Sequence, residues 1–229
     1  MKISSEFSKY AAQYEIKNII QDKVASKLID SIHGKPKNIL DLGCGSGAIC
    51  KKIDWEYNHF TGVDFAAGML ELHPKSEKIE SIYGDFNSNL LFESLLPNDY
   101  DYIFSASALQ WSENLDKTLN YISQFKIPIA LAIFTSNTFR TLNETASLKP
   151  MLRDVCEIEK LQKKYFFADF EVVNYKLEFE STREIFKYIK QSGVSASRKV
   201  LSYKETKKLM NEYPLSYLEF EVAFITSKQ

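Results

Sequence analysis

Three glycines and three acidic residues stand at positions where they could bind one ligand together. Residues 41–47 read Asp-Leu-Gly-Cys-Gly-Ser-Gly and follow directly on a short apolar run. Glycines in a turn after a strand permit positive φ and let the backbone approach a ligand closely. Asp64 ends a second apolar run, and Asp85 follows a third. We expect these groups to meet at the carboxyl edge of a parallel sheet, where such folds bind ligands.

The spacing of the glycines and their acid favours a cationic ligand. A dinucleotide site uses GxGxxG to seat a pyrophosphate on a helix N-terminus, whereas this chain has GxGxG preceded by Asp41. A carboxylate there would repel a pyrophosphate but would suit S-adenosylmethionine, which carries an ammonium and a sulfonium. Asp64 is placed to accept hydrogen bonds from both ribose hydroxyls, and Asp85 from the adenine amine. Alternatively, Asp41 and Asp85 only cap helices or turns.

Apolar runs and helical patterns predict the elements that position these residues. Alternating strands and helices imply a parallel sheet with helices on both faces, and a hairpin of the last two strands adds an antiparallel strand. We therefore predict an α/β, Rossmann-like doubly wound, mostly parallel seven-stranded sheet with one antiparallel edge strand. Strands are expected at 38–42, 59–64, 79–83, 100–105, 128–135, 172–179 and 217–225, and helices after the glycine turn and at 16–32, 66–72, 114–125, 182–192 and 203–211.

The chain is expected to form a single domain over residues 1–229, because no linker, repeat or low-complexity segment interrupts it. Residues 1–34 are expected to form an N-terminal helical lid, in which Tyr10 and Tyr14 share one helix face with Phe7. That face could equally be a packed apolar stripe. Residues 136–170 are expected to form a helical insertion after the fifth strand.

Composition excludes several classes of protein. The formal net charge is −1, from 29 basic and 30 acidic residues, so no global attraction to nucleic acid or anionic membrane is expected. No apolar stretch approaches the ~20 residues that span a bilayer, and no signal peptide is visible. Three cysteines suggest a reducing, cytoplasmic location. The three histidines are scattered and no CxxC occurs, so no metal site is expected.

Four further stretches carry a resemblance to one family. They read Phe-Ser-Lys-Tyr-Ala-Ala-Gln-Tyr-Glu at 7–15, Ala-Leu-Gln-Trp at 108–111, Ile-Lys-Gln-Ser-Gly-Val at 189–194 and Tyr-Pro-Leu-Ser-Tyr at 213–217. With the glycine turn, they make the chain resemble the class I S-adenosylmethionine-dependent methyltransferases. More narrowly, the chain resembles the malonyl-acyl-carrier-protein O-methyltransferases of biotin synthesis, the BioC family. It departs from that family in lacking Pro-Gly-Gly before the fifth strand.

The resemblance implies methyl transfer from S-adenosylmethionine to the free carboxylate of a malonyl thioester on acyl carrier protein. This is an early step of pimeloyl and biotin synthesis. A carboxylate with a pKa of roughly 4 is already ionised near neutrality and needs no general base. The alternatives are a class I enzyme acting on another small carboxylic acid or metabolite, a donor-binding subunit without activity, and an NAD-dependent reductase, which the glycine spacing disfavours.

The resemblance also implies roles for individual side chains. Tyr14 would close over the donor, and Gln110 and Trp111 would face the acceptor. Arg140 would hold the acceptor carboxylate, with Arg183 as a second choice. Trp111 could instead be a core anchor, and Arg140 a solvated surface residue. The residues expected to contact the donor are Asp41, Gly43, Cys44, Gly45, Gly47, Asp64, Phe65, Met69, Gly84, Asp85, Phe86 and Ser105.

A basic stretch suggests a partner surface. Lys and Arg residues are concentrated in 182–208, and Arg183, Lys187 and Lys190 fall on one face of the helix expected there. A carrier protein with an acidic recognition helix would be attracted to this face, mainly through its association rate. The default alternative is a solvated basic face.

Overall fold

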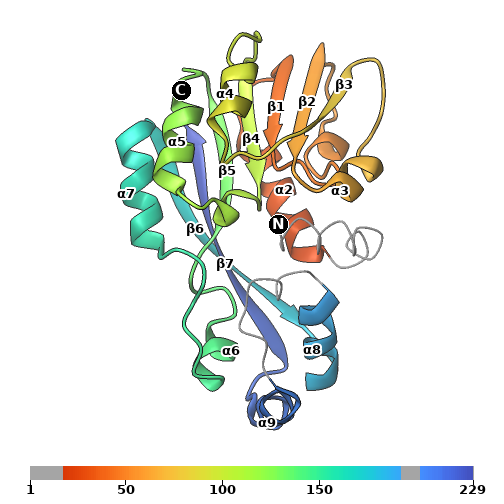
Figure 1. The fold of residues 1–229 in the computed structure, drawn as a ribbon, viewed down its shortest axis with the longest axis vertical. Helices are drawn as coiled ribbons and strands as arrows, with labels where there is room; N and C mark the ends of the chain where they lie inside the picture. The colour runs from red at the N-terminus through yellow and green to blue at the C-terminus, as the bar shows by residue number, and fades with distance from the viewer. Residues whose placement is uncertain (1–17, 192–201, 229) are drawn as a thin grey trace.

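Seven strands in the described part of the chain form one sheet. The computed structural model describes residues 18–191 and 202–228. Across the sheet the strands lie in the order β3-β2-β1-β4-β5-β7-β6 (Figure 1). The strands are β1 (Asn38–Leu42), β2 (His59–Asp64), β3 (Ile79–Tyr83), β4 (Tyr102–Ala106), β5 (Ile129–Phe134), β6 (Ala168–Glu178) and β7 (Tyr217–Ser227).

The strand directions confirm the predicted sheet. Strands β1 to β5 pair in parallel, while β7 runs antiparallel to both β5 and β6. The single antiparallel strand therefore lies one position inside the edge, which β6 forms. The strand order reverses between β1 and β4. In open α/β sheets, ligands bind outside the carboxyl ends of the strands at such a reversal.

Helices cover both faces of the sheet. Helix α2 packs against β4, β5 and β7 on one face, and α4, α5 and α7 contribute to the core on the other. The helices are α2 (Ile19–Ser31), α3 (Ala67–Leu72), α4 (Asn89–Leu95), α5 (Leu115–Ser123), α6 (Arg140–Thr145), α7 (Val155–Tyr165), α8 (Thr182–Gln191) and α9 (Tyr203–Glu212), with 3₁₀ turns η1 (Cys50–Lys52) and η2 (Leu109–Trp111).

Central strands are buried on both faces, which explains why their sequences are continuously apolar. All six residues of β5 are buried, and so are four of the five in β1. Along β5, Ala130 and Ala132 pack toward α2, and Leu131 and Ile133 pack toward the opposite face. Parallel strands covered by helices on both faces have this composition, so the central sheet could be placed from sequence.

A smaller lobe extends from the carboxyl edge of the sheet. Strands β6 and β7 pair over their whole length, and residues 217–221 of β7 continue beyond its pairing with β5. Helices α6, α8 and α9 lie around this extension, at the bottom of Figure 1. Ile185, Leu209 and Phe220 are buried there. The two late strands thus connect the sheet to the lobe.

Three elements differ from the sequence prediction. The glycine turn is followed by the single 3₁₀ turn η1, because the chain becomes extended at Ile53 and turns back toward β2. Helix α4 was not predicted. Strand β6 begins at Ala168, inside the segment expected to be helical, because it pairs with the very end of β7 through Ser227. The part of 136–167 that is helical consists of α6 and α7.

Candidate functional site

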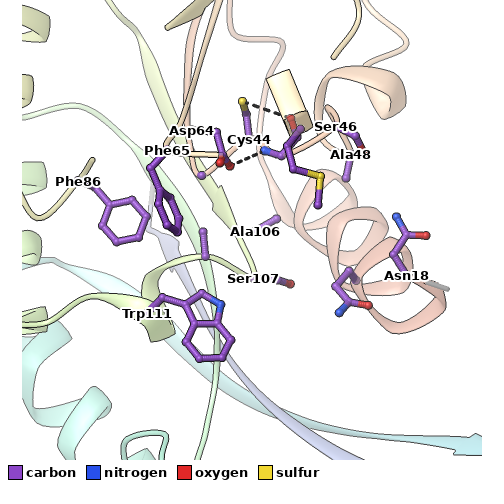
Figure 2. Close-up of a pocket in the computed structure, with 15 residues that line it drawn as sticks. Asn18, Cys44, Ser46, Ala48, Asp64, Phe65, Phe86, Ala106, Ser107 and Trp111 are labelled. Atoms are coloured by element: carbon purple, nitrogen blue, oxygen red, sulfur yellow. Dashed lines mark hydrogen bonds between the residues drawn. The ribbon is translucent and has the colours of Figure 1, made fainter. Parts of the chain in front are cut away.

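A pocket opens at the carboxyl ends of β1, β2 and β4, beside the start of α2. Figure 2 shows Asp64, Phe65 and Phe86 on one side of it, Trp111 at one end and Asn18 from α2 opposite. The rings of Phe65 and Phe86 meet edge to face with centroids 6.4 Å apart. The pocket therefore combines an aromatic wall with one acidic side chain.

The glycine turn has a backbone path that only glycine adopts without strain. Gly43, Gly45 and Gly47 have φ of 76°, 54° and 88°, values that L side chains rarely adopt. A Cβ added to Gly43 would lie 2.1 Å from the Cβ of Ala108. The turn is also tied to β2, because Gly43 N and Cys44 N donate to the Val63 carbonyl at 2.7 and 3.0 Å. The turn is therefore rigid and closely packed beside the pocket.

Asp64 is the acid that reaches the pocket. Asp64 is 8% exposed. One of its carboxylate oxygens accepts a hydrogen bond from Gly45 N at 2.9 Å (Figure 2), and the other accepts one from Ala66 N at 2.8 Å. Burial raises the pKa of Asp64, while hydrogen bonds from backbone N–H groups oppose that rise. Because a carboxylate offers about four acceptor positions, it keeps acceptor capacity for hydroxyl groups of a ligand.

Asp41 lies behind the glycine turn rather than in the pocket lining. It is 1% exposed, and neither carboxylate oxygen has a hydrogen-bond partner among the described residues. Burial, and secondly the charge of Asp64, raise the pKa of Asp41 to about 8. An unpaired buried carboxylate is costly in its charged form. A positive charge bound close to the glycine turn would therefore lower the pKa of Asp41 and favour its ionised form.

The segment after β4 forms the end wall of the pocket. Ser107 has φ of 60°, and η2 then places Trp111 in the lining. Gln110 is buried and donates from Nε2 to the Ser107 carbonyl at 2.6 Å. The side-chain oxygens of Ser107 and Gln21, two lining residues, are buried without a hydrogen-bond partner. The pocket thus holds polar groups that a polar ligand would satisfy.

Comparisons with known proteins match this chain to methyltransferases. Residues 39–125 match the model of a methyltransferase domain. The chain is 26% identical to a malonyl-[acyl-carrier protein] O-methyltransferase of Acetivibrio thermocellus, over 86% of this chain and 79% of that protein. It is also 26% identical to a second such enzyme from Ilyobacter polytropus, over 99% and 94%. A putative methyltransferase of Bacillus halodurans has the same fold at a TM-score of 0.62 and 10% identity, covering 88% of this chain and 96% of that one.

The matched domain contains β1 to β4 and the whole glycine turn. This chain is a class I S-adenosylmethionine-dependent methyltransferase. The residues of the pocket fit that donor, since Asp64 offers a carboxylate to the ribose hydroxyls and the buried oxygens of Gln21 and Ser107 offer partners to its polar groups.

The structure brings most of the predicted donor residues of this methyltransferase together. Those in the pocket lining are Gly43, Cys44, Gly45, Asp64, Phe65, Met69 and Phe86, and Trp111 joins them from the predicted acceptor residues. Gln110 supports the wall from behind. Their contacts with the donor and acceptor remain predictions.

Other predicted donor residues lie outside the lining. Ser105 is fully buried and donates to the Leu42 carbonyl at 2.6 Å, so it ties β4 to β1. Gly47 packs beneath the turn, where an added Cβ would lie 2.4 Å from Pro74. Gly84 packs against Leu91. These residues support the pocket by shaping the elements around it.

Asp85, predicted to contact the donor, and Arg140, predicted to hold the acceptor, make other contacts in the structure. Asp85 is exposed, and its Oδ1 accepts hydrogen bonds from Asn87 N at 2.9 Å and Asn87 Nδ2 at 2.8 Å, so it closes a local turn. Arg140 begins α6 in the small lobe (Figure 1), where its exposed side chain lies 3.6 Å from Glu144. Tyr14 lies outside the described residues.

Several lining residues of the methyltransferase were missed from sequence. Asn18 and Gln21 come from the start of α2, and Ser107 directly follows β4. Ser107 could have been predicted from its position at the carboxyl end of a strand, the same feature that identified Asp64. Only the tertiary packing of α2 against β4, β5 and β7 brings the two amides to the pocket.

Two further searches concern the described residues alone. Within residues 18–191 and 202–228, no three His, Cys, Asp or Glu side chains gather closely enough to hold a metal ion. None of the helices in the same ranges is long and apolar enough to cross a membrane.

Proposed function

We propose that this methyltransferase methylates the free carboxylate of a malonyl group carried as a thioester on acyl carrier protein, an early step of pimeloyl and biotin synthesis. The observation that carries the proposal is the extent of the similarity. The family model ends at residue 125, but two relatives named malonyl-[acyl-carrier protein] O-methyltransferase match 86% and 99% of the chain, and the second match therefore extends over the lobe. The lobe follows the donor domain and faces its carboxyl edge, where an acceptor must approach.

The chemistry of this acceptor suits the pocket. S-adenosylmethionine, when bound, supplies a methyl group on a sulfonium, and the carboxylate oxygen forms its bond to that methyl as the sulfur–methyl bond breaks. The acceptor is ionised near neutral pH, because its pKa is roughly 4. No histidine lines the pocket among the described residues, and none is required. The protein then acts by orientation and by excluding water.

Each part of the pocket has a role in this proposal. Asp64 binds the ribose of the donor, and the aromatic pair of Phe65 and Phe86 lies beside it as an apolar wall. Trp111 forms the wall that the acceptor meets. Tyr14 is proposed to cover the site. The acceptor carboxylate is proposed to bind an N–H or cationic group near Trp111, since Arg140 lies outside the pocket lining and pairs with Glu144.

The test is mass spectrometry of malonyl-acyl carrier protein incubated with enzyme and S-adenosylmethionine. One added methyl per carrier is expected, and fragmentation in the mass spectrometer should place it on the malonyl group. Succinyl-carrier protein, malonyl-coenzyme A and free malonate serve as comparison acceptors. Transfer to free malonate or another small acid with none to the carrier would favour the alternative, a small-molecule methyltransferase. Absence of transfer to every carrier substrate would contradict the proposal.

The basic face of α8 is proposed to receive the carrier protein. Arg183 and Lys187 are exposed and lie one turn apart on α8 in the lobe (Figure 1); nothing is described of the Lys190 side chain. A carrier with an acidic recognition helix would be steered toward these cations, an effect that falls with ionic strength.

Reversing both charges, as Arg183→Glu with Lys187→Glu, is expected to lower kcat/KM for malonyl-carrier protein by about 5- to 20-fold at low salt. Malonyl-coenzyme A should be used at an unchanged rate. The matched control is Lys160→Glu with Lys163→Glu, which makes the same charge change on exposed positions of α7. Equal loss on both substrates would remove α8 from the docking surface.

A further inference from the structure

Arg153 joins the segments that follow β4 and β5. It stands just before α7, and its side chain is only 22% exposed. Its Nη2 donates to the Ser112 carbonyl at 2.7 Å and to the Glu113 carbonyl at 3.3 Å. Its own carbonyl accepts from Ser136 N at 2.8 Å. One residue thus connects the chain after β4 to the chain after β5.

Asn87 reaches the same two residues from the opposite side. Its Oδ1 accepts from Glu113 N at 2.9 Å and from the Ser112 hydroxyl at 3.5 Å. Its own amide groups donate to Asp85, as described above. The segment after β3 is therefore part of the same network, and Asp85 acts in it as the group that orients Asn87.

Ser112 is held from several directions and directly follows Trp111. It is 3% exposed, its backbone N donates to the Leu109 carbonyl at 3.0 Å, and its hydroxyl lies 2.7 Å from that of Thr118. Trp111 has little freedom when the next residue is fixed in this way. Because Trp111 lines the pocket, the network sets the position of the pocket wall.

The geometry points to Arg153 as a positioning residue that, with Asn87, fixes Trp111 for the approach of the methyl acceptor. Arg153 acts through the backbone of residues 112–113 and does not touch the reacting atoms. A guanidinium suits this role because its rigid, planar set of five donors can serve two carbonyls at once, whereas lysine offers a single flexible ammonium. The inference rests on the proposed function only for the identity of the acceptor.

The test follows Trp111 itself. The chain contains two tryptophans, so Trp55→Phe leaves Trp111 as the one tryptophan, which is excited selectively at the red edge where tyrosine does not absorb. In that background Arg153→Met, which keeps the aliphatic stem, should shift the emission of Trp111 to longer wavelength and raise its quenching by acrylamide at least twofold. The emission wavelength and quenching of Arg153→Lys should lie between those of the Trp55→Phe background and those of Arg153→Met. Lys163→Met, in α7, removes an exposed cation that bonds Glu159 and should change neither reading.

Kinetics complete the test. With Trp55 intact, Arg153→Met and Asn87→Ala should each lower kcat/KM for the acceptor by about tenfold, while the Kd for S-adenosylhomocysteine stays within about twofold. Asn87→Ala removes a different set of hydrogen bonds to residues 112–113. It therefore tests the inference independently if the arginine variant does not fold. Unchanged Trp111 quenching would overturn the inference, and so would a parallel loss of donor affinity. The fluorescence reading requires no acceptor, so it remains decisive even if malonyl-carrier protein is not the substrate.

Discussion

Asp64→Ala is expected to weaken S-adenosylmethionine binding on the order of 100- to 1,000-fold. A hydrogen bond to a charged group contributes about 1.5–3 kcal/mol, two ribose hydroxyls are available, and each 1.4 kcal/mol is about tenfold in Kd. The variant also removes the acceptor for Gly45 N, so the glycine turn loses one of its hydrogen bonds to β2 and keeps those from Gly43 N and Cys44 N to the Val63 carbonyl. Titration calorimetry with S-adenosylmethionine and S-adenosylhomocysteine measures the effect.

Two further variants make the Asp64 result specific. Asp64→Asn keeps the shape and one acceptor oxygen but loses the charge, so its affinity should fall between wild type and Asp64→Ala. Asp116→Ala removes an exposed acid that bonds Lys164 and Tyr165 away from the pocket, and donor affinity should be unaltered. Wild-type affinity in Asp64→Ala would refute the ribose assignment.

The central sheet was predictable because burial on both faces leaves a strong local pattern. Strands β1, β2 and β3 have the predicted boundaries, and the antiparallel pairing of the last two strands was expected from their order. Helix α4 was missed although Leu91, Phe92 and Leu95 are buried in it, because it is short and follows a polar turn. The helix predicted after the glycine turn is only the 3₁₀ turn η1, because the chain must soon return to β2. No local sequence pattern predicts where that return begins.

The site shows the same division between local and tertiary information. Asp64 and Trp111 line the pocket because the ends of parallel strands share one edge, a rule that applies to any such sheet. The rule does not tell where a side chain points: Asp85 turns to Asn87, and Arg140 lies in the lobe beside Glu144. Arg153, which supports the pocket wall, carries no signal in sequence that separates it from other arginines.

The buried charge of Asp41 has a consequence for stability. Burial gives Asp41 a pKa of about 8 in the folded protein, far above the ordinary aspartate value of 3.8. The folded protein therefore binds more protons than the unfolded chain between these two values. The free energy of unfolding must fall as pH rises through this window. Asp64, whose pKa is also raised, acts in the same direction, whereas His73, whose pKa burial lowers, acts in the opposite direction below pH 6.5.

Asp41→Asn is expected to remove most of this loss, because the amide mimics the protonated acid at every pH. A pKa rise of about four units corresponds to an upper limit on the order of 5 kcal/mol. The variant should match wild type near pH 3.5, below both pKa values, and exceed it by several kcal/mol at pH 8. Urea unfolding of both proteins at each pH measures the difference. The contribution of His73 cancels in that difference, whereas Asp64 cancels only apart from its electrostatic coupling to Asp41. Asp54→Asn, at an exposed position a few residues further along, should parallel wild type. An equal pH dependence in wild type and Asp41→Asn would show that the pKa of Asp41 does not change on folding, and would contradict this prediction.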